Sequence, residues 1–195
     1  MIAYKGFNKN LQATMGKGIF SYEVGKTYEE ASAQCVRTGF HCVEEPIEVL
    51  SWYKDTDSRY CVVKAEGDIH EDGQERISCT KLTLIKEIDR IQLATHECRW
   101  MQEHPERKYS EHIAQNKGTA DKYFVIVRGK NPMARGKKGA VLFLVKEYAR
   151  SKKIKEIAAY EVDGKTIKEN TYYDTEGKEA EKNACKGKNQ AVKTA

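Results

Sequence analysis

The chain has 195 residues, a net charge of +5 at pH 7, 39% hydrophobic residues and 32% charged residues. This apolar content can build a core, which excludes wholesale disorder, and the length fits one domain or two small ones. The first residues contain no signal-peptide segment, and the longest apolar run, Ala140 to Val145, is too short to cross a membrane. We therefore expect a cytoplasmic protein.

Residues 1–88 predict an α+β module built on a mixed sheet with two or three helices. Strands are expected where apolar residues run together or alternate, at residues 2–7, 19–24, 60–65 and 77–85. Thr27 and Glu30 have the spacing of a capping box, which satisfies two free backbone amides, so a helix is expected from about Tyr28 to Arg37. Pro46 suits the first position of a second helix.

Residues 89–121 predict a helical insert or linker. Asp89 and Gln92 resemble a helix start, and apolar residues follow at helical spacing, so a helix is expected from residue 89 to about residue 103. Pro105 ends it, because proline cannot continue the hydrogen-bond ladder. The polar residues 105–121 are expected to form a loop or a further short helix.

Residues 122–177 predict an antiparallel β-hairpin module, with strands expected at 123–127, 141–145 and 155–162. Asp163 and Gly164 predict a tight hairpin, because glycine accepts the positive φ of a type I′ turn, so a return strand is expected over residues 166–173. Residues 178–195 are rich in Lys, Glu, Ala, Asn and Gln, and are expected to form a short charged helix or a frayed tail.

Charge is distributed unevenly along the chain. Residues 130–157 carry nine basic and two acidic residues, a net charge of +7, whereas residues 44–57 are acidic. This asymmetry suggests two faces with different partners, or one charged partner. The alternative is that these charges are ordinary solvated side chains. The candidate partner-binding residues are Arg135, Lys137, Lys138, Lys152 and Lys153 on the basic side and Glu44, Glu45 and Glu48 on the acidic side.

Cysteine and histidine residues form no recognisable metal or nucleophile motif. The six cysteines include no C-x-x-C pair, so free thiols in a reducing cytosol are expected. His96 and Cys98 are two residues apart on a predicted helix and point in different directions. His41 and Cys42 are adjacent, so they face opposite ways in a strand. We expect no metal site.

Motifs in the first half of the chain follow one another in a fixed order and spacing. They are Tyr4-Lys5-Gly6-Phe7, Phe20-x-Tyr22-Glu23-Val24-Gly25-Lys26-Thr27-Tyr28, Gly39-Phe40-His41-Cys42-x-Glu44-x-Pro46-x-x-Val49-Leu50-x-x-Tyr53 and Glu66-Gly67-Asp68-Ile69. With them, residues 1–90 resemble an uncharacterised domain common in phage and prophage proteins of gut bacteria. Val162 to Tyr173 resembles the closing hairpin module of its relatives. The resemblance implies a phage context and the host-cell cytosol, but no particular activity.

A weaker similarity is to the mono-ADP-ribosyltransferases. The strand at Tyr4 and the Gly39-Phe40-His41 segment are similar to the first two motifs of that family. Tyr53 closes the helix that follows, and Glu75 is the candidate for the catalytic glutamate. The resemblance implies NAD as a cofactor, with Tyr4, His41 and Tyr53 lining the nicotinamide pocket and Glu75 stabilising an oxocarbenium-like transition state.

The leading hypothesis is a non-enzymatic phage accessory protein that uses no cofactor. It would bind a host protein or protein–nucleic-acid complex, most concretely as an anti-CRISPR-like inhibitor of a bacterial defence system. One alternative is an ADP-ribosyltransferase-like enzyme that uses NAD. The other is a nucleic-acid-binding protein that uses the basic residues 130–157, with affinity that falls steeply with salt.

Overall fold

The computed structural model describes residues 1–16, 18–73, 76–120 and 122–180. In this part of the chain strands account for 47% and helices for 11% of the residues, so the protein is mostly β. The expected α+β fold is therefore wrong. The described residues contain one 3₁₀ helix, η1 (Pro46–Ser51), and one α-helix, α1 (Arg90–Glu103). No helix among them is long and apolar enough to span a membrane.

Residues 1–88 form a small antiparallel barrel. Strand β1 (Ile2–Phe7) pairs with β5 (Phe40–Val43) and β6 (Arg59–Glu71), and both of these pair with β7 (Arg76–Ile88), which closes the ring. Strand β4 (Thr27–Glu29) pairs antiparallel with β7, and β2 (Gln12–Ala13) pairs with β3 (Phe20–Ser21). Alternate residues of each strand face the interior, as the period of two requires.

The helix expected at residues 28–37 is absent. Thr27 pairs with Thr83 of β7, and their hydroxyls lie 2.8 Å apart, so Thr27 does not cap a helix. Tyr28 instead packs edge to face against Phe20, Tyr22 and Phe40. Pairing with β7 supplies the backbone bonds of this segment, and aromatic packing outweighs the local capping signal.

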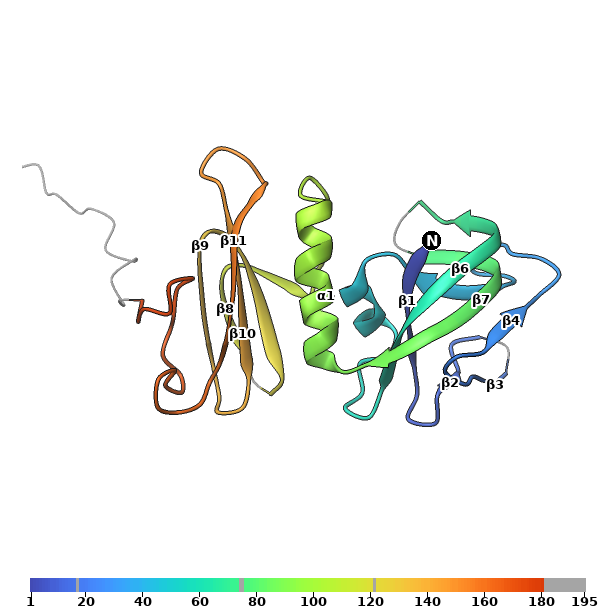
Figure 1. Cartoon of the computed structure of the whole chain (residues 1–195), viewed down its shortest axis with the longest axis horizontal. Coiled ribbons are helices and arrows are strands. Elements are labelled where there is room, and N and C mark those ends of the chain that lie inside the picture. Colours follow the sequence, from blue (N-terminus) through green and yellow to red (C-terminus); the bar gives the residue numbers. More distant parts are fainter. Residues whose placement is uncertain (17, 74–75, 121, 181–195) are drawn as a thin grey trace, which may run out of the picture.

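Helix α1 confirms the helix expected after Asp89. The Asp89 side chain accepts from the Gln92 amide at 2.8 Å, and the Gln92 side chain accepts from the Asp89 amide at 3.0 Å. The helix lies between the barrel and the C-terminal sheet (Figure 1). Its face toward these neighbours buries Leu93, Cys98 and Met101. One continuous core therefore joins the two halves of the molecule.

Residues 113–180, the C-terminal unit, contain a four-stranded sheet in the order β11-β10-β9-β8. The strands are β8 (Ile113–Ala120), β9 (Phe124–Gly136), β10 (Val141–Glu147) and β11 (Ile154–Glu161). Only β10 and β11 are antiparallel; β8 pairs with β9, and β9 with β10, in parallel. The expected antiparallel module is thus wrong for two of the three strand pairings. Strand β8 occupies a stretch expected to be a loop or helix.

Parallel neighbours normally require a connection of a dozen or more residues. Here Ile113 pairs with Ile126 and Ile126 with Phe143, although only a few residues separate consecutive strands. The chain returns by bending within the strands, at Asn116 (φ 59°) in β8 and between Arg128 and Met133 in β9, where the register shifts. Successive segments therefore wind as coils of a short β-solenoid.

The bend is close-packed. A Cβ on Gly129 would lie 2.2 Å from Oδ1 of Asn116, so only glycine allows the two bends to touch. One face of the sheet, with Ile113, Ile126 and Phe143, packs toward α1. The other face, with Val127 and Leu142, covers a second core.

Residues 162–180 close this second core without the expected return strand. Asp163 accepts from the amides of Lys165 (2.7 Å) and Ile167 (3.0 Å), which turns the chain. The buried Tyr173 then exchanges two backbone hydrogen bonds with Ala134 of β9. The predicted tail, residues 178–195, lies outside the described residues from residue 181 onward.

Candidate macromolecule-binding surface

The acidic candidates do not form an open face, because they hold the barrel against the rest of the chain. Glu44 forms an ion pair with Arg107 at 2.8 Å. Glu48 accepts from Ser110 Oγ at 2.6 Å. Glu45 is 2% exposed, so it cannot reach a partner in this conformation. These interactions fasten η1 to the segment that follows α1.

Glu45 also lies against a second buried carboxyl, that of Glu97 on α1, to which it is hydrogen-bonded. The Glu97 carboxylate accepts from the Ile47 amide at 3.1 Å. Burial raises the pKa of Glu97 to about 7, because desolvation disfavours the charged form. In its neutral form Glu97 can face Glu45 without charge repulsion.

The basic candidates fall into two separate groups. Lys137 and Lys138 lie in the loop before β10, whereas Lys152 and Lys153 lie in the loop after it, at the opposite end of that strand (Figure 1). Seven strand residues separate the groups by about 20 Å. All four lysines are exposed. The segment that is continuous in sequence is therefore two surfaces in space.

The first of these surfaces contains a basic–aromatic cluster, made of Lys117, Arg135 and Tyr172. The Lys117 ammonium lies 4.1 Å, and the Arg135 guanidinium carbon 4.9 Å, from the centre of the Tyr172 ring. Arg135 Nε donates to Thr119 Oγ1 at 3.2 Å. A lysine, an arginine and a tyrosine from three separate segments thus meet at one point on the surface.

The fold fixes the position of this cluster. Lys117 pairs with Met133 and Thr119 with Arg135, in the second halves of β8 and β9. Tyr172 is held by its neighbour Tyr173, which is 1% exposed and bound to the β9 backbone. The hydroxyl of Tyr173 also accepts from the Lys168 amide at 2.9 Å. The backbone next to Tyr172 is therefore fixed by the buried Tyr173, which positions the Tyr172 ring.

Carboxylates near this cluster are already engaged. Those between residues 162 and 180 accept backbone amides or pair with lysines within the same unit: Asp163, Glu169, Asp174, Glu176 and Glu179. By contrast, no carboxylate in the described part of the chain forms an ion pair with Lys117, Arg135, Lys137 or Lys138. The surface therefore carries an uncompensated positive charge.

Lys117 and Tyr172 were not predicted from the sequence. Lys117 lies in a polar stretch expected to be a loop or helix, and Tyr172 lies in the expected return strand. One signal was available: Lys117 and Thr119 alternate with Gly118 and Ala120, which is the two-residue period of a strand with one buried face. The partnership with Arg135 depends on parallel winding, which local patterns do not show.

Three of the four residues of the NAD hypothesis, Tyr4, His41 and Tyr53, form hydrogen bonds within the protein. The Tyr4 hydroxyl lies 2.9 Å from His96 Nδ1. His41 Nε2 accepts from the Val36 amide at 2.8 Å, and burial lowers the pKa of His41. The Tyr53 hydroxyl accepts from the Thr14 amide at 2.8 Å. Glu75 lies outside the described residues.

Buried thiols and one buried amine lie in the barrel interior. Lys5, Cys42 and Cys79 are all almost fully buried, and the two thiols are hydrogen-bonded to each other. Burial lowers the pKa of Lys5, whose ammonium donates to the His41 carbonyl at 2.5 Å. The described cysteines form no disulfide, and no group of three His, Cys, Asp or Glu within the described ranges could hold a metal ion.

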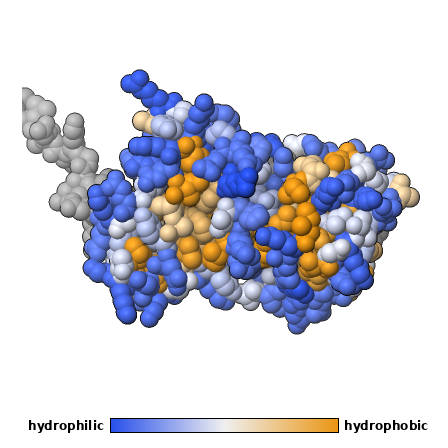
Figure 2. All heavy atoms as spheres, viewed as in Figure 1, coloured by the Kyte–Doolittle hydropathy of each residue, from blue (hydrophilic) through white to orange (hydrophobic). Residues whose placement is uncertain are grey.

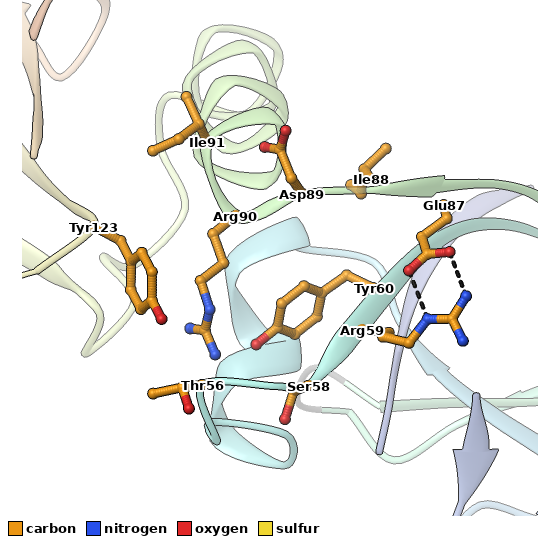
Figure 3. Close-up of a pocket in the computed structure, with 10 residues that line it drawn as sticks. All are labelled: Thr56, Ser58, Arg59, Tyr60, Glu87, Ile88, Asp89, Arg90, Ile91 and Tyr123. Carbon is orange, nitrogen blue, oxygen red and sulfur yellow. Dashed lines mark hydrogen bonds and ion pairs between the residues drawn. The ribbon is translucent and has the colours of Figure 1, made fainter. Parts of the chain in front are cut away.

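A cleft of about 340 Å³ lies at the junction of the barrel, α1 and the C-terminal unit. Figure 3 shows the Arg90 side chain between the rings of Tyr60 and Tyr123, at 5.3 and 5.0 Å from their centres. Arg90 Nη2 also donates to the carbonyls of Lys54 and Asp55. These contacts connect the two halves through Arg90, and its Nη2 is already engaged with backbone carbonyls.

Hydrophilic side chains cover most of the face in Figure 2, and apolar ones gather in separate patches over the barrel and the C-terminal unit. Fold and surface together define a two-part β protein with a positively charged surface on its C-terminal unit. Residues 1–96, slightly under half of the chain, match a family model described as a domain of unknown function (DUF7666). No curated protein and no solved structure matches the chain. The family description names neither a phage source nor an ADP-ribosyltransferase, so both resemblances stay hypotheses.

Proposed function

We propose that this chain is a non-enzymatic accessory protein that binds an acidic host macromolecule through the basic surface of its C-terminal unit. The observation that carries the proposal is the unequal use of charge. The acidic residues Glu44, Glu45 and Glu48 make internal contacts. By contrast, no carboxylate among the residues that the structure describes forms an ion pair with Lys117, Arg135 or Lys137. Uncompensated charge of one sign attracts an oppositely charged partner and speeds its association.

The biological setting of the proposal comes from the phage-type motifs in residues 1–90. In that setting the acidic macromolecule is a protein or protein–nucleic-acid complex of a bacterial defence system. The chain then acts as an anti-CRISPR-like inhibitor in the host cytosol. Binding alone is enough for such a role, since a chain that covers the nucleic acid of a defence complex keeps that complex from its target.

Affinity capture from a bacterial host tests the binding. The tagged chain is compared with a Lys117→Glu/Arg135→Glu variant and with a Lys152→Glu/Lys153→Glu variant, which changes the net charge equally at the other end of β10. We expect a specific set of partners with the wild type, its loss with the first variant and its retention with the second. Capture that is equal for all three proteins would contradict the proposed surface.

A phage plating assay tests the anti-defence form. Hosts that carry a defined CRISPR system are infected with a targeted phage, with and without expression of the chain. Restored plating that depends on Lys117 and Arg135 would support inhibition. No restoration in any defence background, together with specific capture of another partner, would reject the anti-defence form and leave the binding function standing.

A further inference from the structure

The basic–aromatic cluster lies on the outer face of the bent part of the solenoid. Gly118 and Ala120 face inward in β8, as do Ala134 and Gly136 in β9, so the residues between them point outward. Lys117 and Arg135 are two of these outward residues. By the same alternation Lys137, which is exposed, continues the row beyond the end of β9, about 7 Å from Arg135.

Arg135 is held in a way that leaves it ready to bind. Its Nε donates to Thr119, and its guanidinium carbon lies near the Tyr172 ring. No acceptor within the described residues meets its two terminal nitrogens, which form the fork that matches a phosphate. Lys117 adds a second positive charge on the same ring.

The arrangement fits nucleic acid better than an acidic protein. An acidic protein would have to place a carboxylate opposite each cation, including Lys137 and Lys138. A nucleic acid supplies a dense and regular row of phosphates, about one charge per 1.7 Å of duplex axis, without any such matching. The cations also lie on segments that buried residues position, so little side-chain order is lost on binding.

We propose that the anionic partner is nucleic acid and that Lys117, Arg135 and Lys137 hold its phosphodiester backbone, an inference that rests on the binding function above. Tyr172 is the positioning residue. Its ring holds the ammonium and the guanidinium near one point by cation–π attraction. Because the ring contacts these two cations, it does not stack on a base. Binding is therefore independent of sequence and strongly dependent on salt.

Fluorescence anisotropy with a short labelled oligonucleotide, single-stranded and as a duplex, tests this at salt concentrations between about 50 and 200 mM. Lys117→Ala/Arg135→Ala is expected to weaken binding about tenfold or more and to reduce the slope of log affinity against log salt by between about 1 and 2. Lys152→Ala/Lys153→Ala, with the same loss of charge, is expected to keep affinity within about threefold. Tyr172→Leu should weaken binding about threefold, and Tyr172→Phe should retain it.

Three results would overturn the inference. One is the absence of oligonucleotide binding at the lowest salt concentration. Another is equal weakening of binding by Lys117→Ala/Arg135→Ala and by Lys152→Ala/Lys153→Ala. The third is equal affinity for labelled polyglutamate, which would indicate an acidic protein instead. Circular dichroism of each variant checks folding. Host-partner capture is scored separately, so a failure for nucleic acid with capture still dependent on Lys117 and Arg135 leaves the proposed function intact.

Discussion

Arg128 Nε lies 2.9 Å from Oε1 of Glu147, and their side chains are only 2% and 8% exposed. Arg128 Nη2 also donates to the carbonyls of Pro105 and Lys152, at 2.7 and 2.9 Å. The Tyr109 hydroxyl donates to the same Glu147 oxygen. This buried pair therefore ties the segment after α1 and the loop after β10 to the sheet.

We predict that Glu147→Gln destabilises the protein by about 3 kcal/mol, because it leaves the Arg128 charge buried without its counter-ion. Urea unfolding measures the loss. Lys178→Gln removes one partner of the exposed Lys178–Glu176 pair and should leave stability almost unchanged. Equal small losses for the two variants would show that Arg128 is stabilised by its carbonyl contacts alone.

A second prediction concerns pH. The pKa of Glu97 is raised by burial from 4.5 to about 7 in the folded protein. Between these values the folded state keeps a proton that the unfolded state has lost, so stability falls as pH rises through this window. Glu97→Gln removes the effect, and should raise stability at pH 8 by up to about 3 kcal/mol relative to wild type while changing it little below pH 4.5.

Urea unfolding of both proteins across that pH range measures the difference. Burial is the main cause of the raised Glu97 pKa, and the charge of Glu48 raises it further. The hydrogen bonds to the Ile47 amide and the Glu45 side chain, and the charge of Arg128, act in the opposite direction. Glu103→Gln, on the exposed side of the same helix, serves as the control, because it keeps Glu97 and should therefore lose stability over the same pH range as the wild type. A variant less stable than wild type at every pH would mean that the carboxyl is needed as an acceptor.

Gly6 allows Tyr53 to pack on β1. A Cβ at this position would lie 2.8 Å from the Tyr53 ring and 2.9 Å from its Cβ. Gly6→Ala is therefore expected to cost about 1–3 kcal/mol, as overpacking does. Thermal unfolding followed by circular dichroism measures it. Gly16→Ala is the matched control, since its Cβ would meet nothing within 4 Å, and a similar loss there would refute the steric explanation.

Arg90→Ala is expected to loosen the junction between the two halves. The substitution removes the cation between Tyr60 and Tyr123 and the bonds to two carbonyls, at a cost of about 1–2 kcal/mol. Faster hydrogen exchange at residues 54–60 and 123–126, measured by mass spectrometry, would show where the loss falls. Arg99→Ala, which breaks an exposed pair with Glu103, should leave exchange there unchanged.

Local signals predicted the fold where nothing long-range competed with them. The Asp89–Gln92 capping box predicted α1 because its apolar face and its cap agree. Thr27 and Glu30 have the same type of signal, yet their segment pairs with β7 as a strand and packs Tyr28 into an aromatic cluster. Equivalent patterns gave opposite outcomes because tertiary pairing, invisible in a short window, decided the second case.

The binding surface was predicted only in part for a similar reason. Arg135, Lys137 and Lys138 lie in an obvious basic run. Lys117 and Tyr172 come close to them only through the parallel pairing of β8 with β9 and the bonds of Tyr173 to β9, which the sequence pattern does not show. The acidic residues at 44–48 looked like a second face, but Glu45 is buried against Glu97 of a distant helix. Composition shows how much charge a segment carries, whereas only the fold shows which charges neutralise each other.

Winding in coils makes the C-terminal unit adjustable in size. A further segment of about the length that separates Ile113 from Ile126 could enter between β8 and β9 as one more turn, without altering the closed ring of the barrel. Each added turn would widen the sheet by one strand spacing, about 4.8 Å. The width of the C-terminal sheet would then grow in regular steps while the barrel stays the same.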